Sequence, residues 1–292
     1  MYDIIDMDQG SAQWHILRAN HIGASDAPVI MGVNKFRVSD GRIKTPHILW
    51  QQKLGLIDCT VDNAAMRYGR NMEQPAREAY EMATGTKMTP CVIVSKQYPH
   101  MMASLDGLSD NGLAIEIKNC SVEDHEIARQ GRVPDHYYPQ VMHQMICLGA
   151  DHMHYYSYHR SEGIIVDVPY DASYAKKLII MEQEFWAHVR NLTDPPLTDH
   201  DYYPMDADWA DKARMLDEIN ESIRVQQQLA DEIKAELVSL CAGRNAIGGN
   251  YMLSSVTRKG SIDYGNIPEL QSINLDQYRR PDTQYWQLRR RR

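Results

Sequence analysis

One stretch, residues 106–118, constrains the fold of this 292-residue chain more than any other. Residues 101–105 lead into it, and Asp110-Asn111-Gly112 near its middle is typical of a hairpin turn, because Asn and Gly tolerate the positive φ that such turns need. Residues 113–118 alternate, which places Leu113, Ile115 and Ile117 on one face of a strand and Ala114, Glu116 and Lys118 on the other. The pattern predicts two antiparallel strands joined by a tight turn.

This hairpin would bring Asp106, at the end of the first strand, close to Glu116 and Lys118 on the second. Two converging carboxylates suit Mg²⁺, which favours one or two carboxylates together with waters and substrate phosphate. A Lys on the same face could orient or deprotonate a metal-bound water, which is a constellation for phosphodiester hydrolysis. A solvated hairpin face with a weak Glu–Lys pair explains the same residues equally well.

Charge is distributed unevenly along the chain, whose formal net charge is −8. Residues 256–292 carry twice as many Lys and Arg as Asp and Glu, whereas the remainder is acidic. An acidic body with a basic tail is one pattern of a nucleic-acid partner, and a carboxylate-rich metal site also adds acidity. The net charge therefore does not exclude a nuclease.

The five cysteines are scattered without a C-x-x-C pair, which argues against a zinc site, an iron–sulfur cluster or a disulfide framework. The first ten residues lack a basic leader pattern, and no apolar run approaches the length of a membrane span. We therefore expect a soluble cytoplasmic protein without a membrane partner, in the bacterial host cytoplasm if a phage encodes it.

Helical and strand patterns alternate over the first 200 residues, which predicts an α/β fold. Helices are expected at 14–18, 27–31, 45–56, 62–84, 121–131, 138–149 and 171–192, and strands at 88–94, 152–159 and 163–168 in addition to the central hairpin. The predicted domains are a core at 1–200 and a C-terminal appendage at 201–292.

Near the N-terminus, Arg18 and Ser25 precede a predicted helix that Ser25 or Asp26 could cap. A helix N-terminus with a free hydroxyl and a facing Arg is a phosphate-binding arrangement. Spacing alone favours the simpler interpretation, in which the cap is only a cap and Arg18 is a surface charge. Glu73, on the 62–84 helix, could equally be a surface carboxylate paired with Arg77 at i+4.

The appendage begins with one long amphipathic helix over 208–242, whose apolar residues recur at steps of three, four or seven, with Gln226-Gln227-Gln228 as an interruption. We expect it to dock on a partner element or subunit rather than form an isolated coiled coil, since the apolar repeat is short. A small β segment over 249–256 and a tail ending in Arg289–Arg292 follow. The tail either holds DNA or is a disordered terminus; the sequence supports both equally.

Taken together, the chain resembles the phage lambda exonuclease / YqaJ-type viral recombinase family, a branch of the PD-(D/E)XK nucleases. The resemblance spans roughly residues 10–190. One departure is Leu105, where the family usually has Pro. The matching motifs, in chain order, are W-x3-R-x6-S (Trp14, Arg18, Ser25), G-x3-E (Gly69 to Glu73), S-x-D-G (Ser104 to Gly107), D-x9-E-x-K (Asp106, Glu116, Lys118) and Y-x2-Q (Tyr137 to Gln140).

The resemblance implies a mixed central sheet flanked by helices, and a role for each matched residue. Asp106 and Glu116 become Mg²⁺ ligands together with the carbonyl of Ile117, and Mn²⁺ is expected to substitute. Lys118 positions the attacking water, and Glu73 holds a second metal or its waters. The implied pocket for a 5′-terminal phosphate consists of Arg18, Ser25, Ser104 and Gln140, with Trp14 and Tyr137 beside the DNA end.

The family also implies 5′→3′ removal of mononucleotides from linear double-stranded DNA, a ring-shaped homotrimer and a single-strand annealing protein as partner. Two alternatives remain open. One is another PD-(D/E)XK nuclease, either RecB-like or an endonuclease. The other is a catalytically inactive DNA-binding recombination scaffold, against which the presence of Asp106, Glu116 and Lys118 argues.

Overall fold

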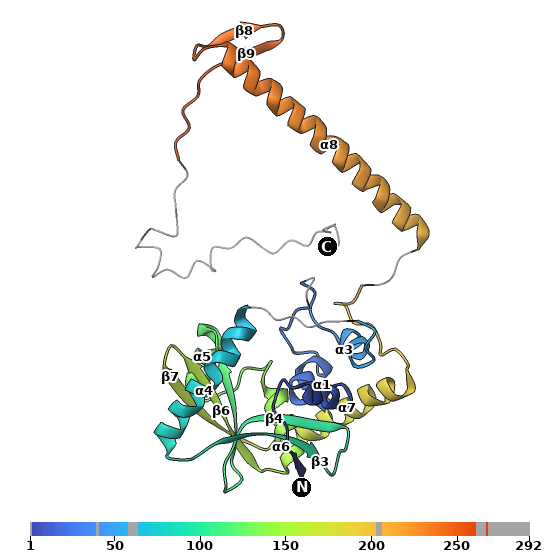
Figure 1. Ribbon diagram of the computed structural model, residues 1–292, viewed down its shortest axis with the longest axis vertical. Coiled ribbons are helices and arrows are strands. Elements are labelled where there is room, and N and C mark those ends of the chain that lie inside the picture. Colours follow the sequence, from blue (N-terminus) through green and yellow to red (C-terminus); the bar gives the residue numbers. More distant parts are fainter. Residues whose placement is uncertain (1, 39–40, 58–63, 203–205, 261–266, 268–292) are drawn as a thin grey trace. The chain divides into compact units, whose positions relative to one another are not determined.

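The computed structural model describes residues 2–38, 41–57, 64–202, 206–260 and 267 (Figure 1). The chain divides into two compact units, and the division falls between Tyr202 and Tyr203. The first unit contains a sheet of seven strands with helices on both faces. This confirms the predicted α/β class with a mixed central sheet flanked by helices.

The sheet of the first unit is mixed because one internal pairing is parallel. Its strands follow the order β1-β3-β4-β5-β6-β7; β5 and β6 run parallel, while the other pairs along this path are antiparallel. The seventh strand, β2, pairs in parallel with β4. The strands are β1 (Tyr2–Ile5), β2 (Ile22–Gly23), β3 (Thr89–Ser95), β4 (Met101–Leu108), β5 (Ala114–Asn119), β6 (His152–His159) and β7 (Glu162–Pro169).

The predicted central hairpin is β4 and β5, and its two strands soon diverge. They pair only at Gly107–Ile115 and Leu108–Ala114. The start of β4 instead pairs with β2, at Met101 and Met102, on the edge opposite β3. Residues 104–106 of β4 and 116–118 of β5 therefore line an opening between the two strands, which we call the fork. The turn forms as expected, with Gly112 at φ +86°.

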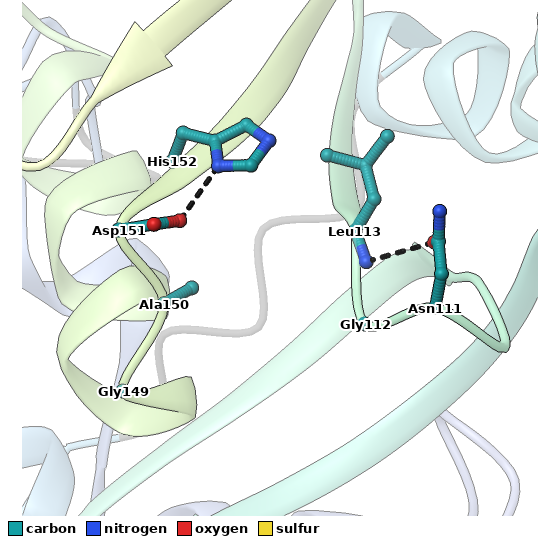
Figure 2. Close-up of a pocket in the computed structure, with 7 residues that line it drawn as sticks. All are labelled: Asn111, Gly112, Leu113, Gly149, Ala150, Asp151 and His152. Atoms are coloured by element: carbon teal, nitrogen blue, oxygen red, sulfur yellow. Dashed lines mark hydrogen bonds and ion pairs between the residues drawn. The ribbon is translucent and has the colours of Figure 1, made fainter.

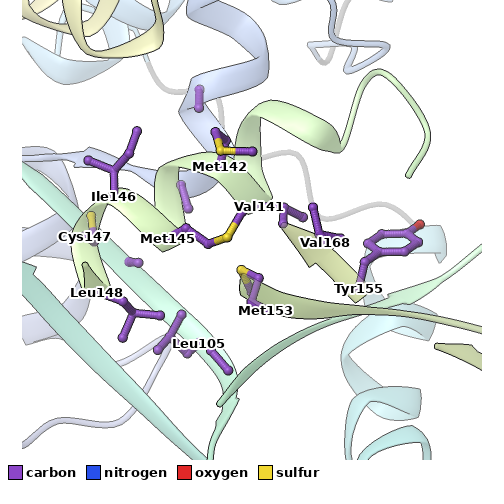
Figure 3. Close-up of a cluster of buried hydrophobic side chains, with 14 of the residues drawn as sticks. Leu105, Val141, Met142, Met145, Ile146, Cys147, Leu148, Met153, Tyr155 and Val168 are labelled. Carbon is purple, nitrogen blue, oxygen red and sulfur yellow. The ribbon is translucent and has the colours of Figure 1, made fainter. Parts of the chain in front are cut away.

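Helices pack on the two faces of the sheet through separate apolar clusters. On one face, Ala76 and Tyr80 of α4 pack against Ile115 and Ile117 of β5. On the other face lies α6, whose apolar side chains meet Leu105, Met153 and Tyr155 in the largest core cluster (Figure 3). The fork is thus reached by α4 from one face and by α6 from the other. The helices of this unit are α1 (Ala12–Ala19), α2 (Ala27–Ile30), α3 (Pro46–Lys53), α4 (Ala64–Thr84), α5 (Val122–Arg129), α6 (Tyr138–Leu148) and α7 (Ala172–Asn191).

Local sequence signals explain where several helices begin and end. Thr45 caps α3 by accepting a hydrogen bond from the backbone N–H of Ile48, and Pro46 occupies the first helical position. Gly149 ends α6 in the left-handed conformation. The predicted boundary or kink at Pro75 does not end α4, which continues to Thr84.

The second unit consists of the long helix α8 (Ala207–Leu240) followed by a small hairpin, β8 (Ala246–Gly248) and β9 (Tyr251–Leu253). Asp206 caps α8 by accepting a hydrogen bond from the N–H of Trp209. The basic tail expected from residue 278 onward lies outside the described residues. Within the described parts of the chain, no helix combines the length and apolarity needed to cross a bilayer.

Candidate active site

The fork is closed by a side chain where strand pairing stops. Oδ2 of Asp106 accepts a hydrogen bond of 2.7 Å from the backbone N–H of Ile117. The Asp106 carboxylate therefore takes the place of a missing backbone partner and is held beside β5. The next residue must be glycine, because a Cβ on Gly107 would lie 2.7 Å from the Cβ of Met88. The Asp-Gly pair thus satisfies two local requirements, a carboxylate acceptor and an absent side chain.

Glu116, on the other arm of the fork, is 2% exposed and has three donors. Lys118 Nζ and Gln140 Nε2 both lie 2.5 Å from its Oε1, and Gln144 Nε2 lies 2.5 Å from its Oε2. The two glutamines are on α6, one turn apart, so this helix supplies both amides. A buried carboxylate requires such compensation, because an unpaired buried charge is strongly destabilising.

Lys118 is held as a cation at the mouth of the fork. Burial lowers its pKa, but the charges of Glu116 and Asp106 outweigh this effect, and the pKa lies above its ordinary value. Its ammonium also lies 5.2 Å from the ring centroid of Tyr137, within cation–π range. A protonated Lys118 can donate hydrogen bonds and stabilise negative charge, and it cannot accept a proton in this state.

The carboxyl of Asp106 lies in an environment that disfavours its negative charge. Burial raises its pKa well above the usual range and the charges of Glu116 and Glu73 raise it further, although Lys118 and the Ile117 N–H act in the opposite direction. Glu73 is therefore within electrostatic reach of Asp106. Its Oε1 lies 3.2 Å from Nη1 of Arg77, as the i+4 pairing predicts, and the same Nη1 donates to the carbonyl oxygen of Asp106 at 2.7 Å.

These residues fit a divalent cation that keeps much of its water. Oδ1 of Asp106 receives no hydrogen bond from the described part of the chain, whereas Oδ2 is engaged. Added positive charge would relieve the repulsion that raises the pKa of Asp106. No three His, Cys, Asp or Glu side chains among the described residues are arranged to hold an ion by themselves. The expected trio of Asp106, Glu116 and Glu73 is thus not a preformed three-carboxylate site, because Glu73 is paired with Arg77.

A second cluster lies where the resemblance places a phosphate pocket. Nη2 of Arg18 donates to Oγ of Ser25 at 2.6 Å, and its guanidinium lies 5.0 Å from the ring centroid of Trp14. The indole Nε1 of Trp14 in turn donates to Oγ of Ser104 at 2.9 Å. Because Ser104 is on the arm of the fork that carries Asp106, these contacts connect the second cluster to the carboxylates.

The second cluster also contains a buried ion pair that the sequence analysis did not identify. Nζ of Lys53 lies 2.7 Å from Oδ2 of Asp26, and Oδ1 of Asp26 lies 3.6 Å from Nη2 of Arg18. Burial raises the pKa of Asp26, but the charges of Lys53 and Arg18 outweigh it and hold the pKa well below the usual range. Two cations around one carboxylate leave a net positive charge, which suits an anionic ligand.

Some expectations for these residues change. The side chain of Asp26 does not cap α2, which is only four residues long, so the phosphate site at a helix N-terminus is not formed there. Arg18 is not an isolated surface charge, since it contacts Ser25 and Asp26. Gln140 was grouped with Arg18 and Ser25, yet its amide is engaged with Glu116, because that buried carboxylate needs donors.

Gln144 and Lys53 were not predicted as site residues. The only sequence signal for Gln144 was its position one turn after Gln140 on a mostly apolar helix. A hollow at the β4–β5 turn, where Asn111, Gly112 and Leu113 face Gly149, Ala150, Asp151 and His152, contains none of the candidate site residues (Figure 2). The fork and the second cluster therefore form a site without a small-molecule pocket of this kind.

Fold and site together define an α/β protein with a D-x9-E-x-K constellation at a strand fork. Residues 13–151 match the family described as YqaJ-like viral recombinase domain. This confirms the family resemblance, and the chain contains a domain of that family. Over 144 residues, 48% of its length, the chain is 28% identical to "Uncharacterized protein YqaJ" of Bacillus subtilis (strain 168) and spans 43% of that protein.

The fold is also similar to that of a solved protein, an alkaline exonuclease (LHK-Exo) from Laribacter hongkongensis. The TM-score is 0.53 at 23% identity, covering 62% of this chain and 94% of the other. The structure of LHK-Exo in complex with dAMP matches with the same values. At this identity the similarity establishes a shared fold.

Proposed function

We propose that this chain is a metal-dependent exonuclease that degrades linear double-stranded DNA from 5′-phosphorylated ends to mononucleotides. Digestion in the 5′→3′ direction would leave 3′ single-stranded overhangs for recombination by single-strand annealing. The observation that carries the proposal is the connection between the two clusters. Ser104 and Asp106 lie two residues apart on β4, one bonded to Trp14 beside Arg18 and the other closing the fork.

The chain's own residues have distinct roles in this proposal. Arg18 and Ser25 would bind the terminal phosphate, and the buried Asp26–Lys53 pair would hold Arg18 in place. Asp106, Glu116 and the Ile117 carbonyl would hold Mg²⁺, or Mn²⁺ in its place. When bound, the cation supplies Lewis-acid charge that favours ionisation of the attacking water and offsets charge on the leaving oxygen.

Lys118 would donate hydrogen bonds to the attacking water or to the scissile phosphate. Its raised pKa supports this role over that of a general base. Glu73 would hold further water or a second cation beside Asp106, and Tyr137 would contact the DNA end. We further propose a ring-shaped homotrimer around the duplex and a single-strand annealing protein as partner, as in the family the chain resembles.

Glu116→Ala tests the catalytic assignment. The variant should lose Mg²⁺-dependent release of nucleotides from 5′-phosphorylated duplex and retain DNA binding, because Glu116 is buried and its loss leaves the second cluster intact. Glu123→Ala, an exposed glutamate on α5, is the matched control and should behave like the wild type. If the wild-type protein binds duplex but releases no nucleotides with Mg²⁺ or Mn²⁺, the chain is a DNA-binding scaffold and the proposal is wrong.

A further inference from the structure

The second unit presents a long apolar surface without a partner in its own fold. Helix α8 contains no buried residue, although Trp209, Leu216, Ile223 and Leu237 are all large and apolar. A helix of 34 residues is about 51 Å long at 1.5 Å per residue. Most helical stability in proteins comes from packing an amphipathic face, so such a surface implies a partner.

The apolar residues of α8 follow a heptad repeat from one end to the other. The helix continues through residues 226–228 without a break, so these glutamines do not divide the repeat. Eight of the ten positions a and d are apolar, and the exceptions are Lys212 and Gln226. Position a is held by Trp209, Leu216, Ile223, Ala230 and Leu237, and position d by Lys212, Ile219, Gln226, Ile233 and Leu240.

Charged side chains lie mainly away from this seam of a and d positions. Arg214 pairs with Asp211 and Arg224 pairs with Glu221, each within the helix and each at the outer positions b, c and f. Lys234, at position e, pairs with Asp231. Charge on the outer surface with an apolar seam is typical of a helix that packs along its whole length against another helix.

The order of residues in the seam favours a second copy of the same helix, running in the opposite direction. Reversed about its midpoint, the seam places every a residue opposite a d residue of the copy. Ala230 then leaves room for Ile219, and Lys212, near the end of the seam, can extend its ammonium to water. The resulting layers are Trp209 with Leu240, Lys212 with Leu237, Leu216 with Ile233, Ile219 with Ala230, and Ile223 with Gln226.

A parallel arrangement suits the same residues less well. It would place Lys212 against Lys212 and Gln226 against Gln226 of the copy, and Ala230 against Ala230. Like charges in one layer are unfavourable, and two small residues in one layer leave a void. The antiparallel register also places Met215 of one helix beside Leu229 of the other, and both of these flanking side chains are exposed and apolar in the single chain.

We propose that α8 forms an antiparallel two-helix interface with α8 of a second copy of this chain. The inference does not depend on the proposed nuclease activity. It also does not depend on how the first unit assembles, since an interface between pairs of chains doubles the mass of whatever assembly the first unit forms.

Light-scattering mass measurements on the full chain test the interface. Ile223→Glu places a charge in the central layer and should halve the mass found for the wild type. Val225→Glu is the matched control, because Val225 is 54% exposed against 57% for Ile223 but lies at position c, off the seam. If Ile223→Glu retains the wild-type mass, or if Val225→Glu lowers it equally, the seam does not join two copies.

Disulfide cross-linking tests the direction. A chain carrying both Ile219→Cys and Ala230→Cys should form a 219–230 link that peptide mass spectrometry identifies among the native cysteines. Within one helix these positions are about 16 Å apart, too far for a disulfide, so the link must join two chains. Each single substitution is the control. If Ile219→Cys alone links efficiently to itself, the helices are parallel; if no link forms, the seam binds another surface. Either result overturns the proposal.

Discussion

Gln144 donates its amide N–H to Glu116 Oε2 at 2.5 Å, and neither side chain is appreciably exposed to solvent. The same amide nitrogen lies 3.4 Å from the carbonyl oxygen of Ser104, so Gln144 spans both arms of the fork from α6. Its own carbonyl oxygen is buried without a hydrogen-bond partner among the described residues. This one side chain therefore fixes the direction of the Glu116 carboxylate and leaves a free acceptor inside the site.

Gln144→Leu should weaken the site without removing a carboxylate. Groups that orient a metal ligand typically account for about 10–100-fold in metal affinity or activity. We expect a loss of this size in nuclease rate, accompanied by a higher Mg²⁺ concentration at half-maximal activity. Gln183→Leu, an exposed glutamine on α7, should change neither quantity. An unaltered Mg²⁺ dependence in Gln144→Leu would show that Glu116 does not need this donor.

Asp106→Asn should stabilise the protein in the absence of divalent cations. Because burial, Glu116 and Glu73 raise the pKa of Asp106, its charge opposes folding at every pH above that raised value. The penalty is absent below the unfolded pKa of about 3.8 and complete above the folded pKa, so it is present at pH 7.

Thermal unfolding with and without Mg²⁺ measures this effect. Mg²⁺ should raise the melting temperature of the wild type and have little effect on Asp106→Asn. Asp167→Asn, an exposed residue on β7, serves as the control and should keep the Mg²⁺ response. A melting temperature for Asp106→Asn below that of the wild type without Mg²⁺ would contradict the account.

His143 should make the protein less stable as the pH rises. Its Nδ1 lies 2.8 Å from Oε1 of Glu182 and its Nε2 lies 3.0 Å from the carbonyl oxygen of Met102, all fully buried. Burial lowers the pKa of His143, but Glu182 and Cys147 outweigh it, and the pKa is raised well above 6.5. A raised folded pKa stabilises fully below the unfolded pKa, and that stability is lost as the pH rises through the folded value.

Denaturant unfolding as a function of pH measures this contribution. From about pH 6.5 upward, one such proton lowers the free energy of unfolding by at most about 1.4 kcal/mol per pH unit. His143→Gln should flatten this slope, whereas His200→Gln, an exposed histidine, should not. Equal slopes in the wild type and His143→Gln would show that His143 is not the group responsible.

Lys53→Met should disrupt the second cluster through Asp26. Removing one partner of a buried ion pair typically costs about 3–5 kcal/mol, because the other charge remains buried. Lys53 also donates to the carbonyl oxygens of Arg18 and His21, so the segment that carries Arg18 should loosen. The double variant Asp26→Asn/Lys53→Met should recover part of the loss in unfolding free energy. Lys177→Met on α7 is the control, and a loss equal to that of the control would contradict the assignment.

The sequence predicted the parts of the fold that local chemistry determines. The Asp110-Asn111-Gly112 turn and the Thr45-Pro46 helix start are specified by neighbouring residues, so both were predictable. The two-residue strand β2 was not, because it is too short to show a period and exists only through pairing with β4. The divergence of β4 and β5 depends on that pairing and could not be read from the hairpin alone.

The candidate site was predictable to the same degree. Asp106, Glu116 and Lys118 lie within one hairpin and share a face, so spacing was enough to bring them together. The pair of Asp26 with Lys53 joins residues on two different elements, and a tertiary contact of this kind leaves no signal in spacing. Gln144 was visible only as a polar residue on a buried helix, because its role depends on where α6 crosses the fork.

The central claim is that the chain digests DNA from a 5′-phosphorylated end, and one assay tests it most directly. Nucleotide release from 5′-phosphorylated linear duplex, 5′-hydroxyl linear duplex and covalently closed circular DNA is compared for the wild type, Arg18→Ala and the control Arg190→Ala. We predict rapid release from the phosphorylated end, slower release from the hydroxyl end and none from the circle, with the preference for phosphate lost only in Arg18→Ala. Rapid cutting of the closed circle, or equal loss on both linear ends in Arg18→Ala, would contradict the account.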